Sequence, residues 1–272
     1  MKTNLLAATL VSVLALGAPV AFAAHHESTH EEGMYEGDDH AAHYAEHHAD
    51  DIAAAINAED RAEDERARDA VRHPDVTLSF SQIEPGSRVM DIGAGGGYYT
   101  MLVSGLVGPE GHVTGQNPQI WEDNYGADWP EVQGAKTDAR DNIDFVIAEF
   151  DDLGVEDGSL DAITFMLTYH DSALLPIDRA VMNQGFFDAL RPGGLLMISD
   201  HYGPEGTGTE WTNDLHRIDA ETVREEVEAA GFELIATSDA MRNTDDDHQT
   251  NVFNPAIRGQ TDRFVYLFRK PE

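Results

Sequence analysis

The chain of 272 residues lacks cysteine entirely, which excludes disulfide bonds, zinc–thiolate sites and cysteine nucleophiles. Positive charge is scarce as well: 17 basic residues, only three of them lysines (Lys2, Lys136 and Lys270), stand against 51 acidic residues. The net charge of −34 repels phosphate backbones and anionic lipid headgroups. We therefore expect no nucleic-acid partner and no membrane partner, and we interpret the charge as an aid to solubility.

Long apolar runs are confined to the N-terminus. Lys2 precedes the apolar run Leu5–Val20, and Ala21-Phe22-Ala23 follows it as a small-x-small cleavage site. The run is too short to span a bilayer comfortably. We predict a signal peptide over residues 1–23 that is cut after Ala23, and a soluble product in the periplasm or outside the cell.

Residues 24–52 are acidic and rich in histidine, with no apolar period that could build a core. This composition predicts a disordered tail. Imidazoles and carboxylates are competent ligands, so a divalent metal on the tail is an alternative, although the spacings define no single geometry. The tail holds seven of the 13 histidines: His25, His26, His30, His40, His43, His47 and His48.

Residues 53–272 predict one α/β domain. Ala53–His73 is expected to be a charged helix that Pro74 ends. Beyond Val76, short apolar runs alternate with helical segments, a pattern typical of a parallel sheet. The expected strands are Arg88–Ile92, His112–Gln116, Ile143–Ala148, Leu160–Leu167, Leu195–Asp200, Phe232–Ser238 and Arg263–Arg269. The expected helices are Tyr98–Val107, part of Val132–Ala139, Pro176–Leu190 and Ala220–Ala230, and Asp239–Asp262 is expected to be a loop or hairpin.

The most informative segment is a buried strand followed by a glycine-rich turn and a helix, Asp91-Ile92-Gly93-Ala94-Gly95-Gly96-Gly97. Glycine is needed where a loop turns sharply and brings bare backbone against a ligand. The segment resembles motif I of the class I S-adenosylmethionine-dependent methyltransferases. Two later segments, Glu149–Asp161 and Leu190–Leu196, resemble the acidic loop and the turn into strand five of that superfamily. The chain is also similar to a narrower group, the predicted exported bacterial methyltransferases, at 169–171, 216–219 and 247–264.

The resemblance implies a Rossmann-like, doubly wound sheet of seven strands with helices on both faces. Its expected strand order is 3-2-1-4-5-7-6, with strand seven antiparallel. S-adenosyl-L-methionine is the implied cofactor, at the carboxyl ends of the first strands. Gly93, Gly95 and Gly97 are the residues that would approach it.

Four further residues are assigned to the cofactor by their positions in the motifs. Asp91 would support the loop or the amino-acid end of the cofactor, Glu149 would lie near the adenine amine, and Phe150 would lie beside the ring. The second strand ends at Asn117, where most relatives carry an acid that accepts both ribose hydroxyls. Asparagine lacks the charge and the second acceptor oxygen of that acid, so we expect weaker binding by Asn117.

A second polar constellation follows the two central strands. Tyr169-His170-Asp171 comes after one of them and Asp200-His201-Tyr202 after its neighbour, so His170 and His201 are expected to converge on a substrate. A histidine with a near-neutral pKa suits removal of a proton from the acceptor, and the adjacent Asp171 would orient it. His216 is a further candidate. A divalent-metal site and plain strand-end capping are the alternatives, but we predict His170, His201 and Asp171 as catalytic and no metal ligand in the domain.

Two further features have open interpretations. Trp121, Tyr125 and Trp129 could form an aromatic lid or pack in the interior. Arg217 and Arg258 could hold an anionic group of a substrate or form internal ion pairs.

Together these features predict an exported S-adenosylmethionine-dependent methyltransferase that acts on a small molecule. The alternative is a non-catalytic protein on the same scaffold that binds metal or a small ligand, because S-adenosylmethionine is made in the cytosol. An NAD-linked oxidoreductase would need an acid where Asn117 stands.

Overall fold

The structure is a computed structural model, and it describes residues 37–125 and 127–272. The predicted signal peptide and residues 24–36 of the predicted tail lie outside the described residues. Within the described part of the chain, no helix has both the length and the apolar composition that crossing a bilayer requires.

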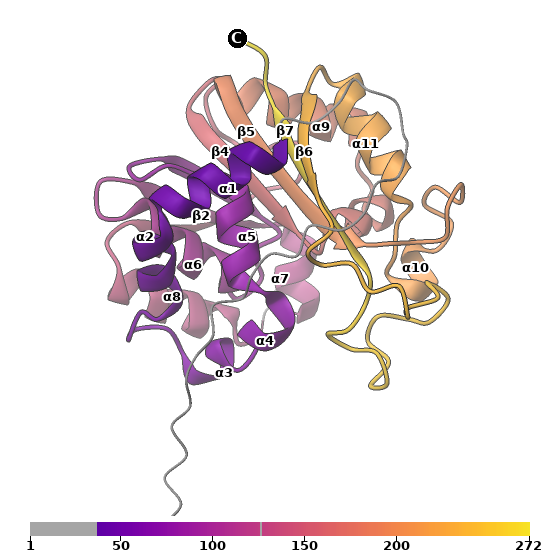
Figure 1. Cartoon of the computed structure of the whole chain (residues 1–272), viewed down its shortest axis with the longest axis horizontal. Coiled ribbons are helices and arrows are strands. Elements are labelled where there is room, and N and C mark those ends of the chain that lie inside the picture. The colour runs from indigo at the N-terminus through magenta and orange to yellow at the C-terminus, as the bar shows by residue number, and fades with distance from the viewer. Residues whose placement is uncertain (1–36, 126) are drawn as a thin grey trace, which may run out of the picture. The chain divides into compact units, whose positions relative to one another are not determined.

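A seven-stranded sheet forms the centre of the described domain, in the order β3-β2-β1-β4-β5-β7-β6 (Figure 1). The first five strands are parallel, and β7 runs antiparallel to both of its neighbours. The predicted fold class and strand order are therefore confirmed. The strands are β1 (Arg88–Ile92), β2 (His112–Asn117), β3 (Ile143–Ile147), β4 (Leu160–Met166), β5 (Leu190–His201), β6 (Glu233–Ser238) and β7 (Arg263–Arg269).

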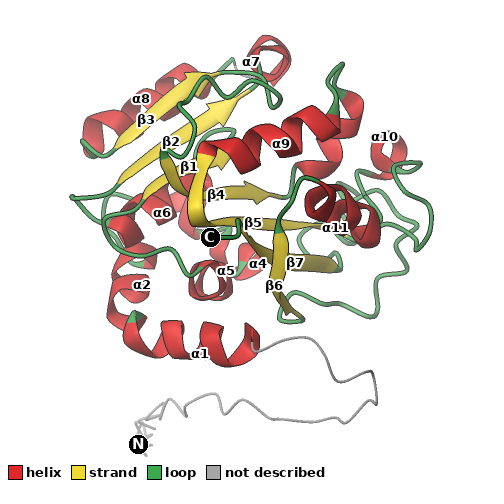
Figure 2. Ribbon diagram, turned by 90° about the horizontal axis from the view of Figure 1, so that it is seen from above, coloured by secondary structure: helices red, strands yellow, loops and turns green. Residues whose placement is uncertain are grey.

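Helices cover both faces of the sheet (Figure 2). One face carries α1 (Gly37–His47), α2 (Ala49–Ile56), α5 (Pro74–Ser81) and α6 (Tyr98–Val107), and the other carries α9 (Arg179–Ala189) and α11 (Ala220–Ala229). Side chains alternate along β1: Val89 packs in the core beneath α6, whereas Met90 and Ile92 pack in the core on the other side. Near β3 lie α7 (Gln119–Tyr125) and α8 (Trp129–Ala139).

The predicted disordered tail is wrong for residues 37–52, because α1 and α2 occupy them. Few side chains hold these helices in place. Ile52 and Ala55 are buried against α5 and α6, and the Tyr44 hydroxyl donates a hydrogen bond to the Ile83 carbonyl. A few contacts with residues distant in the sequence are enough to fix these helices. The segment therefore does not need, and does not show, an extended apolar period.

The predicted single helix over Ala53–His73 is also wrong. The chain leaves α2 at Ile56 and forms two short helices, α3 (Glu63–Arg66) and α4 (Asp69–Arg72). Arg61 causes the fold-back: its buried guanidinium donates to the Ile56 carbonyl and pairs with Asp69 at 2.7 Å. Pro74 begins α5 instead of ending a helix, because proline fits the first turn, where its missing N–H has no helical partner.

The remaining predicted elements agree closely with the structure. Helix α6 and strand β7 have the expected bounds, and Asp219 caps α11 by accepting from the Glu221 amide. Strand β5 begins five residues earlier than expected, at Leu190. Four short helices beyond His73 were not predicted: α5, α7, the 3₁₀ helix η1 (Tyr169–Leu174) and α10 (Thr212–Leu215). Residues 239–262 form a long loop, one of the two predicted alternatives.

Candidate active site

A cavity of about 930 Å³ opens at the carboxyl ends of β1, β4 and β5, which is where ligands bind in open α/β sheets. The glycine loop Gly93–Gly96 forms one wall, and the histidines that follow β4 and β5 form another. Residues of the 60–72 segment and Val252 and Phe253 of the 239–262 loop complete the lining. The cavity thus brings the two predicted constellations to one space.

The three predicted glycines have different neighbours. All adopt left-handed backbone conformations, with φ of +63° at Gly93, +56° at Gly95 and +84° at Gly97. A side chain at Gly95 would enter open space, with Trp129 nearest at 3.7 Å. A Cβ at Gly97 would lie 2.6 Å from the Phe145 ring. Gly93 and Gly95 therefore border the cavity, whereas Gly97 is required for packing.

The end of β2 holds the glycine loop in place. Asn117 accepts from the Gly95 amide at 2.8 Å and donates to the Gly95 carbonyl at 3.1 Å. Gln116 accepts from the amides of Gly93 and Ala94, through its side-chain and main-chain oxygens respectively. Asn117 is 1% exposed, so its amide is engaged with the loop and does not face the cavity. A contact between Asn117 and a ribose stays a prediction.

Asp91 is fully buried beneath the same loop. Its two carboxylate oxygens accept from the hydroxyls of Thr100 at 2.7 Å and Thr164 at 2.8 Å. Burial raises the pKa of Asp91 to about 6, and the two hydroxyls reduce that rise. Asp91 therefore ties β1 to α6 and β4 at the point where the loop begins.

Glu149 and Phe150 do not line the cavity in this structure. Glu149 is exposed and accepts from the Gln119 amide at 3.3 Å. Phe150 is completely buried and meets the edge of Trp121 at 5.5 Å between ring centroids. Trp129 lines the cavity, and Trp121 both lines it and packs against the core. The predicted roles of Glu149 and Phe150 stay predictions.

Two buried oxygens beside the cavity have no hydrogen-bond partner: Thr168 Oγ1 and Glu65 Oε2. Buried polar atoms in native proteins are nearly always satisfied, so such atoms indicate a missing partner. Thr168 Oγ1 lies opposite the glycine loop, and a Cβ on Gly93 would come within 2.7 Å of it. The unpaired hydroxyl thus packs directly against the backbone at the start of the glycine loop.

His170 is held by Asp200, which follows the neighbouring strand. Its Nδ1 lies 2.9 Å from the Asp200 carboxylate and its backbone amide donates to the same carboxylate at 2.7 Å. A carboxylate only accepts, so Nδ1 carries the proton and Nε2 faces the other way. Burial opposes the charged imidazole, but the charge and hydrogen bond of Asp200 outweigh it and raise the pKa of His170. The residue that orients His170 is therefore Asp200, and not the adjacent Asp171 as predicted.

The second predicted histidine, His201, lies on the same wall of the cavity as His170 but has a different hydrogen-bond partner. His201 Nδ1 is 2.8 Å from the Thr261 hydroxyl, and the rings of His201 and His170 are 6.2 Å apart. Burial, with the nearby positive charges of His170 and Arg263, lowers the pKa of His201 well below its usual value. His201 lines the cavity as a neutral imidazole.

His216, the further candidate, is the histidine in contact with His170. Its Nδ1 lies 3.3 Å from His170 Nε2, and Asp171 Oδ1 lies 3.4 Å from the same Nε2. His216 comes from the end of α10, where its backbone is left-handed with φ of +52°. The sequence named His216 only as a further candidate, because no spacing rule connects it with the strand ends.

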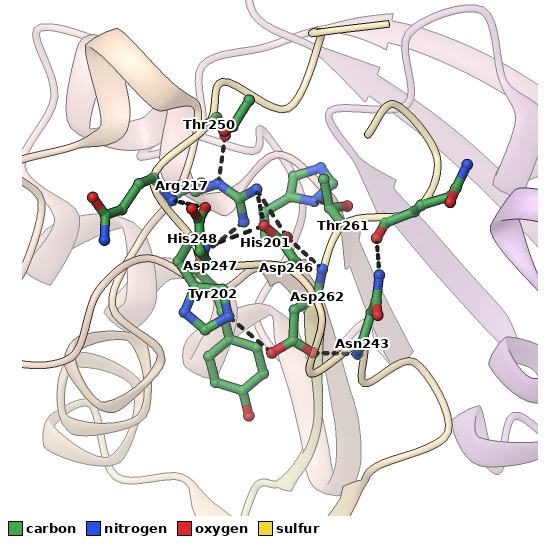
Figure 3. A network of polar contacts seen from close by, with 12 residues as sticks. His201, Tyr202, Arg217, Asn243, Asp246, Asp247, His248, Thr250, Thr261 and Asp262 are labelled. Atoms are coloured by element: carbon green, nitrogen blue, oxygen red, sulfur yellow. Dashed lines mark hydrogen bonds and ion pairs between the residues drawn. The ribbon is translucent and has the colours of Figure 1, made fainter. Parts of the chain in front are cut away.

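Arg217, which follows His216, forms an internal ion pair and does not reach the cavity (Figure 3). The side chain is 0% exposed and pairs with Asp246 at 2.9 Å. It also donates to the carbonyls of Tyr202 and Thr250. Arg258 is exposed, near the Phe253 ring. The structure favours the internal ion pair among the alternatives for Arg217.

Two protein-family models match parts of the chain. The model described as "Protein-L-isoaspartate(D-aspartate) O-methyltransferase" matches residues 48–123, and the model described as "Methyltransferase domain" matches residues 90–198. The second match spans the glycine loop and ends within β5.

Curated relatives are similar over about half of this chain or less. An arsenite methyltransferase of Halobacterium salinarum is 32% identical over 45% of the chain and 29% of the relative. A ubiquinone/menaquinone biosynthesis C-methyltransferase of Vibrio campbellii is 30% identical over 47% of the chain and 46% of the relative. The chain thus matches less than half the length of these relatives.

Solved structures share the fold. A S-adenosylmethionine-dependent methyltransferase from Aquifex aeolicus superposes with a TM-score of 0.54 at 18% identity, over 75% of this chain and 92% of that one. The similarity establishes a common architecture.

Proposed function

The chain belongs to the class I S-adenosylmethionine-dependent methyltransferase superfamily, and we propose that it is an exported methyltransferase that transfers the methyl group of S-adenosylmethionine to a small molecule. The observation that carries the proposal is the shared cavity: ligand-accessible glycine backbone on one wall and a set of polar, oriented histidines on another.

The residues around the glycine loop fit the cofactor. Gly95 leaves room for a ligand against the main chain, because the atom nearest to a Cβ there would be 3.7 Å away, and the Thr168 hydroxyl lacks a partner. Trp121 and Trp129 supply flat apolar surfaces on which an adenine ring can stack. S-adenosylmethionine, when bound, supplies a methyl group that its sulfonium centre already activates.

The wall formed by His170, His201 and His216, called here the histidine wall, is the proposed binding site for the acceptor. A weak nucleophile must be aligned and must lose its proton before it attacks. His170 is the side chain that we propose to activate the acceptor, since Asp200 fixes both its orientation and its protonated nitrogen. Neutral His201 contributes a polar contact on the same wall.

The size of the cavity favours a small acceptor. A volume of about 930 Å³ lies near the upper end of the usual range for small-molecule sites, roughly 300 to 1,000 Å³. Arg68 and Arg72 line the cavity from one side, and Phe253 lines it from the 239–262 loop.

Export is proposed from the N-terminal sequence alone: Lys2, the apolar run and the Ala21-Phe22-Ala23 site. The protein expressed with a C-terminal tag should be recovered outside the cytoplasm. Its mass should correspond to a chain that begins at Ala24, and recovery of the uncut chain in the cytoplasm would contradict the proposal.

The experiment for methyl transfer uses S-adenosylmethionine labelled in the methyl group, incubated with the protein and with two fractions of a bacterial extract, one of small molecules and one of macromolecules. We expect label in the small-molecule fraction, and no transfer by His170→Ala despite retained binding of S-adenosylmethionine. Label in protein or nucleic acid would contradict the small acceptor. Binding of the cofactor without any transfer would favour the non-catalytic alternative.

A further inference from the structure

Three side chains on the histidine wall have the arrangement of a metal site. His170 Nε2, Asp171 Oδ1 and His216 Nδ1 form a triangle with edges of 3.3, 3.4 and 3.7 Å. Zinc binds nitrogen and oxygen ligands tetrahedrally at roughly 2.0 to 2.2 Å, so its ligand atoms stand roughly 3.3 to 3.6 Å apart. Within the described residues, these are the three side chains whose ligand atoms converge in this way.

The ligands are oriented by neighbours that do not themselves bind the ion. Asp200 accepts from His170 Nδ1–H, so the lone pair of Nε2 points into the triangle. A carboxylate behind a histidine ligand is the usual support at metal centres, because it fixes the tautomer and raises the basicity of the ring. Without an ion, His170 Nε2 and His216 Nδ1 lie at hydrogen-bonding distance, 3.3 Å, so an ion would take the place of a proton between the two rings.

The backbone at His216 is fixed by the 239–262 loop. The adjacent Arg217 is locked by Asp246 and by two carbonyl groups (Figure 3). The Val252 amide donates to the Leu215 carbonyl on the other side of His216. These contacts hold His216 in its left-handed conformation, which costs a non-glycine residue energy.

We propose that His170, Asp171 and His216 bind one divalent transition-metal ion, with zinc as the ion that best fits the triangle. Three protein ligands leave a fourth position open, as in catalytic zinc sites, and all three residues line the cavity. The open position would take a hydroxyl or another electron-pair donor of the acceptor. An ion lowers the pKa of a bound hydroxyl, so the acceptor would release its proton to solvent, and His170 would act as a ligand of the ion and not as the base. This last role rests on the proposed methyl transfer, whereas ion binding does not.

The first experiment measures ion binding without cofactor or acceptor. The full chain is freed of metal with EDTA and titrated with Zn²⁺ in competition with a chromophoric chelator. The N-terminal histidines can bind additional ions, so the informative quantity is the difference between variants. We expect His216→Ala and Asp171→Asn each to lose one tight equivalent per chain.

His112→Ala is the matched control, because His112 also contacts an aspartate, Asp144 at 3.1 Å, but lies at the amino end of β2. It should bind as many ions as the unaltered protein. Co²⁺ gives a second readout: tetrahedral binding produces visible absorption that the two site variants should lose. Equal Zn²⁺ binding by the unaltered protein and both site variants would overturn the proposal. Because Asp171→Asn preserves the shape of the side chain, misfolding would not explain its loss of the ion.

The second experiment tests the role of the ion. Transfer of labelled methyl groups by the EDTA-treated protein should fall to background and return on addition of Zn²⁺. Full activity without metal would overturn activation through the ion and leave the methyltransferase proposal standing. No activity in either state, together with normal Zn²⁺ binding, would count against the methyltransferase proposal alone.

Discussion

The side-chain amide of Asn117 forms two hydrogen bonds with one residue: it accepts from the Gly95 amide at 2.8 Å and donates to the Gly95 carbonyl at 3.1 Å. Asn117 therefore acts as a clamp on the glycine loop. An aspartate at this position could accept the first bond but could not donate the second.

The clamp predicts the behaviour of Asn117→Ala. The partly buried Gly95 amide would lose its partner, which costs about 1 kcal/mol of unfolding free energy. We also expect weaker binding of S-adenosylmethionine, because the loop is no longer fixed. Urea denaturation and calorimetric titration measure the two effects. Gln119→Ala, a change at an exposed neighbour, should alter neither quantity, and wild-type values for Asn117→Ala would contradict the clamp.

Asp91 makes the stability of the protein depend on pH. Its pKa is about 6 in the folded protein, above the ordinary value of roughly 3.9 expected when unfolded, so the folded state binds the proton more tightly. The stabilisation is fully present below the unfolded pKa and is lost as the pH rises through 6. Asp91→Asn keeps a partner for each threonine hydroxyl and removes the charge.

Relative to the wild type, Asp91→Asn should therefore gain stability between pH 4 and pH 8, by up to roughly 3 kcal/mol. Urea denaturation at several pH values measures the difference between the two proteins. Parallel stability curves would show that the carboxyl group does not titrate in this range.

Asp246 neutralises a fully buried guanidinium, that of Arg217. Asp246→Ala leaves the charge unpaired, a change that typically costs about 3 to 5 kcal/mol. We expect lower stability and faster proteolysis within the 239–262 loop. Asp245→Ala removes an exposed carboxylate from the same loop and should leave both measurements unchanged. Equal proteolysis of the two variants would contradict the anchoring role of the ion pair.

A substitution at Thr168 tests whether its hydroxyl serves cofactor binding or the stability of the fold. Its hydroxyl has no partner within the described protein, so Thr168→Val should leave stability unchanged or slightly higher. S-adenosylmethionine should bind more weakly, because the unpaired hydroxyl faces the glycine loop. Thermal unfolding and titration of one preparation test both parts. Unchanged affinity would remove Thr168 from the cofactor site.

The sheet and its helices were largely predictable from the sequence, because buried parallel strands are short apolar runs bounded by glycine and polar turns. Helix α6 was found with its correct bounds, since the glycines before it and Gly108 after it mark both ends. The strand order followed from the resemblance to a family and not from periodicity, because no local pattern specifies which strands pair.

The segments whose structure was predicted wrongly, residues 37–52 and 53–73, are fixed by contacts with residues far away in the chain. Tyr44 bonds to Ile83, and Arg61 folds the chain back on Ile56 and Asp69; neither contact leaves a periodic pattern. His216 was named only as a further candidate for the same reason. Sequence placed His170 and His201 at neighbouring strand ends, but His216 reaches the cavity through a loop that Arg217 and Asp246 fix.

Binding of S-adenosylmethionine to the glycine loop is the central claim, and calorimetric titration tests it most directly. Gly95→Val fills the space beside the loop, whereas Gly185→Val, on α9, makes the same change where nothing lies within 4 Å. We predict that the wild type and Gly185→Val bind one S-adenosylmethionine per chain and that Gly95→Val, still folded by circular dichroism, does not. Equal binding by Gly95→Val, or no binding by the wild type, would contradict the account.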